Sequence, residues 1–361
     1  MSRKYNFYAG PATLPLPVLE QIQSEFLDYK GMGMSLVETS HRSPEYDEVH
    51  NKAVSLVKEL LGIGDEFSVM MLQGGATMQF SMVPMNLLNA GNSCDFTMTG
   101  AWAKKACADA KKIGNVNVVF DGSDANYMTL PEPDALQVDP NAVYLHVTSN
   151  ETIGGIQWHK WPESGNVPLV ADMSSDMMSR PLPMDRFGVI YAGAQKNLGP
   201  SGMALVVMRN DLLEKCNDNL TAYMSYKTHA PKNSLYNTPP VFSIWAFGLV
   251  MEWVKNNGGL TGMAALNEKK AAYLYDAMET SGGFYNCPVP GPHRSLMNVV
   301  WRLPTEELEK MFIAEAKAAG MVGLKGHRSV GGCRASIYNA MPEHGCQALA
   351  DLMNTFAAKH G

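Results

Sequence analysis

The sequence lacks any apolar run long enough to cross a membrane. Its longest apolar tract, at 241–254, is interrupted by Ser243 and Glu252, and it is shorter than the roughly 20 residues that a membrane helix needs. Residues 1–13 also lack the continuous apolar stretch of a signal peptide. We therefore expect a cytoplasmic protein without a membrane segment, in which 241–254 forms a buried helix.

The sequence also lacks blocks of like charge and closely spaced cysteine pairs. It has 29 Lys and Arg residues against 35 Asp and Glu residues, for a net charge of −6, so no basic stripe predicts binding to nucleic acid or to an anionic membrane. Its six cysteines include no C-x-x-C pair and no zinc-like spacing. This pattern favours reduced thiols and predicts no metal site.

Short, apolar, β-rich runs recur in the first two thirds of the chain, with helical or turn-rich stretches between them. The predicted strands lie at 68–72, 116–120, 143–148, 168–171, 189–192 and 204–208. Such alternation is typical of an α/β domain built around a mostly parallel sheet. In sheets of this kind ligands bind beyond the carboxyl ends of the strands, so polar residues that directly follow these runs become candidates for the site.

The pattern changes after about Gly258. Helices are predicted at 260–280 and 305–319, with a strand at 298–303 between them and Gly320 as a C-cap. A chain of 361 residues is also long enough for two domains. We therefore expect a large domain at 16–258 and a smaller α+β domain at 259–361, which the N-terminal segment 1–15 joins.

One lysine, Lys196, lies in a turn-rich segment between two predicted strands. The segment 193–202 reads Gly-Ala-Gln-Lys-Asn-Leu-Gly-Pro-Ser-Gly, and its small residues let a ligand approach. Most lysines are solvated surface charges, but a partly desolvated lysine at the rim of a sheet can lose its proton and condense with an aldehyde. Pyridoxal phosphate is the common cofactor for such a lysine.

Candidates for the cofactor's other needs lie upstream. Asp172 ends a predicted strand and can keep the pyridine nitrogen protonated, although it also suits a turn or a helix N-cap. The segment 73–77, Gln-Gly-Gly-Ala-Thr, opens a predicted helix whose N-H groups at Ala76 and Thr77 can hold a phosphate. Trp102 can stack on the ring or can simply belong to the core. Thr152 can donate a hydrogen bond to the phenolic oxygen.

Five motifs resemble those of the phosphoserine aminotransferases. They occur in the same order as in that family, and the likeness extends over nearly the whole chain. They are Gly-Gly-Ala-Thr at 74–77, Gly-Ala-Trp at 100–102, Asn-Glu-Thr-Ile-Gly-Gly at 150–155, Ala-Asp-Met-Ser-Ser at 171–175 and the lysine segment at 193–202. The resemblance implies the aspartate-aminotransferase fold, which is fold type I of the pyridoxal-phosphate enzymes, and a homodimer.

The resemblance also implies a role for each candidate residue. Lys196 would form the Schiff base with pyridoxal phosphate and act as the general base. The residues that would bind the cofactor are Ala76, Thr77, Trp102, Thr152, Asp172, Gln195 and Lys196. From the loop 236–240, Asn237 and Thr238 would complete the phosphate cup of the neighbouring subunit.

Two His-Arg pairs, His41-Arg42 and His327-Arg328, and the nearby Arg334 are the best local anion sites in this mildly acidic chain. By residue type alone each pair also suits an exposed loop. The resemblance assigns Arg334 to the substrate α-carboxylate and both pairs to the substrate phosphate. Because some family members have an arginine where this chain has Thr77, we expect these pairs to carry more of the phosphate recognition here.

The implied reaction transfers an amino group between glutamate and 3-phosphohydroxypyruvate, giving O-phosphoserine and 2-oxoglutarate in serine biosynthesis. The sequence does not separate this keto acid from 3-hydroxy-4-phospho-oxobutanoate of pyridoxine biosynthesis. Two alternatives use the same fold and cofactor, an alanine:glyoxylate-type aminotransferase and a cysteine desulfurase, for which Cys333 or Cys346 would supply the reactive thiol. A third alternative is a scaffold that kept the fold without the chemistry.

Overall fold

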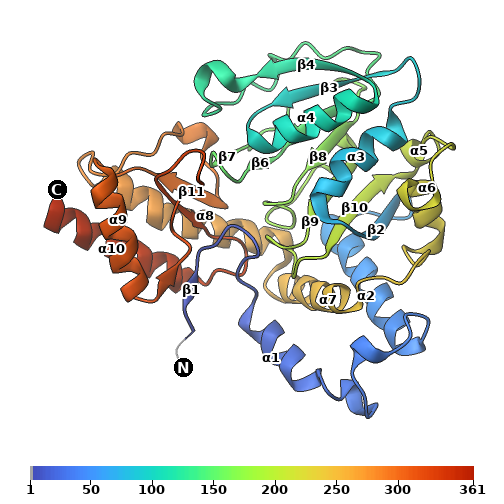
Figure 1. The fold of residues 1–361 in the computed structure, drawn as a ribbon, viewed down its shortest axis with the longest axis horizontal. Coiled ribbons are helices and arrows are strands. Elements are labelled where there is room, and N and C mark those ends of the chain that lie inside the picture. The colour runs from blue at the N-terminus through green and yellow to red at the C-terminus, as the bar shows by residue number, and fades with distance from the viewer. Residues whose placement is uncertain (1–2) are drawn as a thin grey trace.

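A seven-stranded sheet forms the centre of the molecule in the computed structural model, which describes residues 3–361 (Figure 1). In spatial order its strands are β2 (Phe67–Gln73), β10 (Met203–Arg209), β9 (Phe187–Gly193), β8 (Leu169–Asp172), β5 (Leu145–Thr148), β3 (Ser93–Met98) and β4 (Asn115–Asp121). Only β10 runs antiparallel to its neighbours. The predicted α/β fold with a mostly parallel sheet is therefore confirmed, and each of the six strands predicted around this sheet overlaps an observed one.

Helices cover both faces of the sheet. The α-helices of the described residues are α1 (Leu16–Glu25), α2 (Pro44–Leu61), α3 (Gly75–Leu87), α4 (Ala101–Ile113), α5 (Asn210–Leu213), α6 (Tyr226–His229), α7 (Val241–Asn256), α8 (Gly259–Glu279), α9 (Glu306–Ala318) and α10 (Glu343–His360). Alternate residues of one strand point to opposite faces. On β2, Val69 and Met71 pack in a core with α2 and α7, whereas Met70 and Leu72 pack in a core with α3 and α4.

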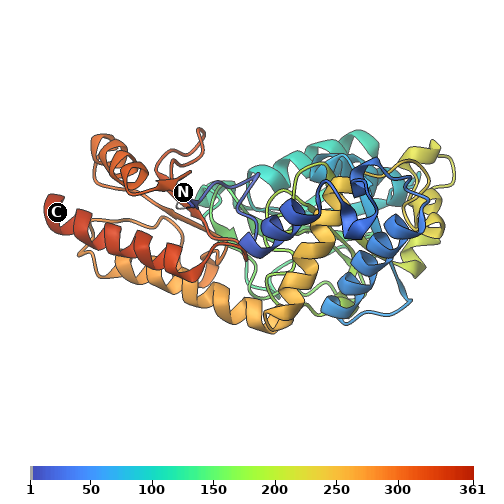
Figure 2. The same cartoon turned by 90° about the horizontal axis from the view of Figure 1, so that it is seen from below.

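A separate apolar core lies in the C-terminal part, among α8, α9, α10 and the strand pair β11 (Asn298–Trp301) and β13 (Cys333–Ser336). The N-terminal strand β1 (Tyr5–Asn6) pairs with β12 (Met321–Val322), and Phe7 enters this core. Figure 2 shows these elements beside the main body, with α8 extending from one part to the other. The predicted domain boundary falls at the start of α8. The division itself stays a prediction, and residues 1–2 of the N-terminal segment lie outside the described residues.

The parallel arrangement brings five chain segments to one edge of the sheet. Strands β2, β3, β5, β8 and β9 all end at this edge, because β10 reverses direction between β2 and β9. Each strand is followed there by one of the motifs singled out in the sequence. The hairpin of β6 (Asn150–Glu151) and β7 (Ile156–Gln157) also begins at this edge, directly after β5.

Among residues 3–361, every helix is too short or too polar to span a bilayer.

Lys270 is a buried cation on α8 whose ammonium is held by backbone carbonyls alone. Its Nζ donates to the carbonyl oxygens of Ile337 at 2.8 Å and of Tyr338 at 2.6 Å. Burial lowers the pKa of Lys270 to about 8, whereas a lysine in an unfolded chain titrates at about 10.4. Between these values the unfolded chain binds more protons at this side chain, so the contribution of Lys270 to stability rises with pH.

We predict that Lys270→Met removes this pH dependence. The difference in free energy of unfolding between parent and variant should shift in favour of the parent as the pH rises from about 8 to about 10. Denaturant titrations of both proteins at several pH values measure this difference in free energy of unfolding. The contributions of the other titrating groups are the same in both proteins and cancel in the difference. A difference that stays constant across this range would contradict the prediction.

Candidate active site

Lys196 lies in the turn that follows β9, and its side chain reaches the other segments at the sheet edge. Its Nζ donates a hydrogen bond to Thr152 Oγ1 at 2.6 Å and lies 5.1 Å from the ring centroid of Trp102. Thr152 follows the short strand β6, and Trp102 lies in the first turn of α4. Three segments that are far apart in the sequence therefore meet at this amine.

The environment of Lys196 stabilises the neutral amine relative to a lysine side chain in water. Burial lowers the pKa of Lys196, and the carboxylates of Asp172 and Glu151 oppose this effect by stabilising the charged form. Burial in turn raises the pKa of Asp172, while Lys196 and Ser174 lower it. A lysine of lowered pKa beside buried carboxylates is typical of an amine that reacts or exchanges protons.

Asp172 is held by the turn that follows β8. Its Oδ1 accepts hydrogen bonds from the backbone N-H of Ser174 at 2.9 Å and from the Ser174 hydroxyl at 2.6 Å. The Ser174 Oγ also accepts from the N-H of Gly193, three residues before Lys196. The turn interaction weighed for Asp172 is thus present, and it fixes the carboxylate at the cavity that also contains Lys196.

The glycine turn after β2 provides unpaired amides at the start of α3. Gly74 and Gly75 have φ values of 96° and 63°, which side chains other than glycine adopt at a cost. Among residues 3–361 no side chain caps α3, so the first-turn N-H groups of Ala76 and Thr77 lack partners within the helix. A Cβ at Gly193 would lie 2.8 Å from Gln195 Oε1 and 3.2 Å from the Ala76 nitrogen. The Gln195 side chain and the α3 amides therefore converge.

A cavity of about 300 Å³ connects these groups. Its lining contains the predicted cofactor residues Ala76, Thr77, Trp102, Asp172, Gln195 and Lys196. Pyridoxal phosphate requires an amine, an anion for its ring nitrogen, a flat surface for its ring and donors for its phosphate. The cavity offers one group of each kind, and the uncapped helix terminus suits the phosphate. The residues present thus fit this cofactor.

Arg334 approaches the site from the C-terminal part. Its Nη1 donates to the backbone carbonyl of Thr152 at 3.2 Å, and its buried Nε has no partner among the described residues. Burial lowers the pKa of Arg334. A partly buried guanidinium with an unused donor suits a carboxylate.

His327 shares a second cavity, of about 140 Å³, with Arg334. Burial and the positive charges of Arg334 and Arg328 lower the pKa of His327. Arg328 itself is exposed. The segment 327–334 therefore collects positive charge beside Thr152.

Two predicted pairs are not brought to the cavity within one chain. His41 and Arg42 lie in the turn before α2, where Arg42 is exposed, and neither side chain bonds to a residue of the cavity among the described residues. Asn237 and Thr238 lie beside Gln73, whose Nε2 donates to the Thr238 carbonyl at 3.1 Å. Their roles stay predictions.

The sequence of this chain matches the model of the aminotransferase class-V family over residues 4–349. The chain belongs to the class-V aminotransferases. It is 55% identical over 361 residues to the phosphoserine aminotransferase of Desulfosudis oleivorans, with 99% of each chain covered. A solved phosphoserine aminotransferase from Bacillus circulans subsp. alkalophilus has a TM-score of 0.97 at 50% identity, with 99% of each chain covered. A PLP-bound phosphoserine aminotransferase from Trichomonas vaginalis has a TM-score of 0.92 at 35% identity, with 97% of this chain and 99% of that one covered.

In this class-V aminotransferase Glu151 is a site residue that the sequence interpretation missed. Its carboxylate accepts the N-H groups of Trp102 at 3.2 Å and of Ala103 at 2.9 Å, and so caps α4. Burial raises the pKa of Glu151 to about 7, although the two amides lower it. A Cβ at Gly100 would clash with the Glu151 carboxyl group, so the glycine of Gly-Ala-Trp lets the carboxylate reach the helix.

The two cysteines weighed for a desulfurase are both buried in the C-terminal core. Burial raises the pKa of the Cys333 thiol, and it raises that of Cys346 to about 12. A nucleophilic cysteine needs a lowered pKa and some exposure. The two thiols have neither property, so the geometry does not favour the desulfurase.

We predict that Glu151→Ala destabilises the cofactor-free protein by about 1–3 kcal/mol, since two N-H groups lose their acceptor. Glu151→Gln should lose less, because its amide oxygen still accepts one of them. Denaturant unfolding at a pH below about 7, where the raised pKa of Glu151 keeps the buried carboxyl group protonated, measures both. Parent-like stability of Glu151→Ala would show that the carboxylate does not hold the start of α4.

Proposed function

We propose that this chain is a pyridoxal-phosphate-dependent phosphoserine aminotransferase, which transfers an amino group between glutamate and 3-phosphohydroxypyruvate. The observation that carries the proposal is the desolvated amine of Lys196, held among Thr152, Trp102 and Asp172 at the end of the parallel sheet. Relatives at about half identity over nearly the full length carry this name. Their names favour it over the alanine:glyoxylate-type enzyme, the desulfurase and the non-catalytic scaffold.

Lys196 holds the cofactor and moves a proton. When bound, the cofactor's conjugated ring supplies the electron sink that stabilises negative charge on the substrate Cα. The neutral Lys196 amine, which the lowered pKa favours, would take the proton from the substrate Cα and hold it for the next transfer. Asp172 would keep the ring nitrogen protonated, Trp102 would provide the surface on which the ring stacks, and the N-H groups of Ala76 and Thr77 with Gln195 would bind the phosphate.

The substrate carries a carboxylate and a dianionic phosphate, and each needs a fixed positive partner. Arg334 binds the α-carboxylate with the guanidinium that already contacts Thr152. His327 and Arg328 bind the phosphate, together with His41 and Arg42. The same groups suit 3-hydroxy-4-phospho-oxobutanoate, which is one carbon longer, and assays of both keto acids side by side rank the two substrates.

Two copies of the chain form the working enzyme. Large apolar side chains are exposed on the N-terminal segment and near the loop 236–240, among them Leu27 at 82% and Phe242 at 39% exposure. The rings of Phe26 and Phe242 lie 6.2 Å apart. An exposed apolar face of this kind favours burial against a partner. Phe242 follows Asn237 and Thr238 closely in the chain, and these two residues complete the neighbour's phosphate cup. The six unpaired cysteines favour the reducing cytoplasm.

The first prediction from this function concerns Lys196. Lys196→Ala should fold and bind pyridoxal phosphate non-covalently, with transamination reduced by at least about a hundredfold because the proton-transferring amine is gone. Lys310→Ala, an exposed lysine on α9, is the matched control and should retain parent activity. Parent-like turnover of Lys196→Ala in a coupled glutamate assay would refute the assignment.

A second prediction concerns substrate choice. Arg328→Ala should raise the KM for 3-phosphohydroxypyruvate by about tenfold or more, because a charge-assisted hydrogen bond to phosphate is lost, and should leave the KM for glutamate within about twofold. Lys325→Ala removes an exposed positive charge from the same segment. It controls for a nonspecific loss of electrostatic attraction between this segment and the anionic substrate. Equal changes in both KM values would contradict the phosphate role of Arg328.

The third prediction tests the contribution across the dimer. The test uses two proteins, the single variant Lys196→Ala and the double variant Asn237→Ala with Thr238→Ala. Each should be weakly active alone. After the two are unfolded together and refolded, mixed dimers gain one intact site, since the Lys196→Ala chain supplies Asn237 and Thr238 to its neighbour. If these two residues served their own chain, mixing would restore nothing.

A further inference from the structure

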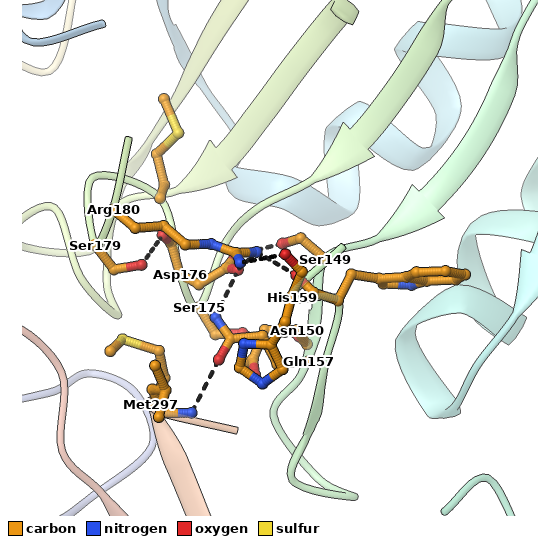
Figure 3. A network of polar contacts seen from close by, with 12 residues as sticks. Ser149, Asn150, Gln157, His159, Ser175, Asp176, Ser179, Arg180 and Met297 are labelled. Carbon is orange, nitrogen blue, oxygen red and sulfur yellow. Dashed lines mark hydrogen bonds and ion pairs between the residues drawn. The ribbon is translucent and has the colours of Figure 1, made fainter. Parts of the chain in front are cut away.

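A buried polar network centred on Asp176 lies beside the candidate site, and the proposed function does not use it (Figure 3). Asp176 is 4% exposed and lies in the turn after β8, four residues beyond Asp172. Its Oδ1 accepts the hydroxyl of Ser149, and its Oδ2 accepts Gln157 Nε2 at 3.0 Å. Arg180 Nη2 lies 3.6 Å from the same Oδ2. Each oxygen of this carboxylate therefore has a defined partner.

Through Ser149 the network reaches Asp172. Strands β5 and β8 end together at the pair Thr148 and Asp172. The next residue, Ser149, donates its backbone N-H to the Asp172 carbonyl oxygen at 3.0 Å, and its Oγ lies 3.0 Å from the same oxygen. Asp176 therefore binds the hydroxyl of Ser149, and the backbone N-H of Ser149 binds the Asp172 carbonyl oxygen.

On its other side the network reaches the C-terminal part of the chain. Gln157 donates to Asp176 and uses its Oε1 to accept the backbone N-H of Leu296 at 2.9 Å. Arg180 donates to the carbonyl oxygens of Trp158 and His159, and the Nε2 of His159 lies 2.8 Å from the Arg294 carbonyl oxygen. The segment 294–296 is therefore tied to the hairpin that follows β5.

The carboxyl group of Asp176 is buried beside the guanidinium of Arg180. Burial raises the pKa of Asp176, and Arg180, Ser149 and Gln157 lower it. Loss of one member of such a group leaves a buried donor or charge without a partner, which costs more than the interaction contributes. Both oxygens of Asp176 are matched by donors in the observed arrangement, whereas the Arg180 Nε is buried without a partner among the described residues.

We propose that Asp176 is a positioning residue for Asp172: through Ser149 and Gln157 it fixes the carboxylate that faces the cofactor nitrogen relative to the segment 294–296. The inference rests on the proposed function, because Asp172 has this role only in the cofactor site. It assigns no direct contact with cofactor or substrate to Asp176.

The donors and acceptors of the network suggest a rescue experiment. Asp176→Asn removes the negative charge beside Arg180. Its amide can still bond, because the oxygen accepts Gln157 Nε2 while the nitrogen donates to Ser149 Oγ, whose hydrogen turns to the Asp172 carbonyl oxygen. Adding Gln157→Glu restores a negative charge near Arg180: the amide at position 176 then turns to donate to the new carboxylate, which also accepts the Leu296 N-H, and its oxygen accepts the Ser149 hydroxyl as Asp176 does.

The experiment measures the dissociation constant of pyridoxal phosphate and the visible absorption band of the bound cofactor for each cofactor-free protein. Asp176→Asn should weaken binding by about tenfold, as expected when the partly buried Arg180 loses its counter-charge, and should alter the band because Asp172 shifts against the ring nitrogen. The double variant Asp176→Asn with Gln157→Glu should bring both readouts back toward the parent values. Ser149→Ala, which keeps the backbone N-H to Asp172, should fold and change both readouts in the same direction.

Asp95→Asn is the matched control. Asp95 is another buried aspartate of the sheet, and it accepts the Asn117 side chain and the Asp139 N-H away from Asp172. Asp95→Asn should lower the melting temperature without changing the affinity or the band. Parent-like affinity and band in Asp176→Asn or in Ser149→Ala, or a double variant no better than Asp176→Asn, would overturn the positioning role. Absence of cofactor binding by the parent would refute the proposed function itself, and the inference with it.

Discussion

The amine of Lys196 is removed from water yet kept beside two carboxylates, and the site depends on this balance. Burial alone would favour the neutral amine, which is the reactive form, whereas Asp172 and Glu151 without burial would leave an ordinary ammonium group. Both effects act on Lys196 in the structure, and burial is the larger. The balance requires Thr152, Trp102 and Asp172 to be held around the Lys196 amine, although the four residues come from four separate segments.

The parallel sheet meets this requirement because parallel strands end at one edge. Five strands place a motif there, and each motif is held by a local device. Gly74 and Gly75 start α3 with free amides, Glu151 caps α4, and Ser174 fixes Asp172. A buried polar network then ties this edge to the C-terminal part, from which Arg334 reaches Thr152.

The sequence predicted the features that depend on local pattern. Strand periodicity identified six strands of the sheet, and the position of Lys196 and Asp172 after strands selected them as candidates. The strand β3 was not predicted, since Asp95 and Thr97 interrupt its apolar pattern and are buried by tertiary contacts. Glu151 was missed because its role depends on α4, which begins some fifty residues earlier in the chain. For His41, Arg42, Asn237 and Thr238, local sequence cannot show which copy of the chain they serve.

The most direct test of the central claim is to find where pyridoxal phosphate attaches. The protein is incubated with the cofactor, the covalent link is reduced with borohydride, and the digested peptides are analysed by mass spectrometry. The account predicts a pyridoxyl-phosphate group on Lys196 at about one per chain, together with loss of the visible band on reduction. Labelling of exposed lysines alone, or no label in a folded protein, would contradict it.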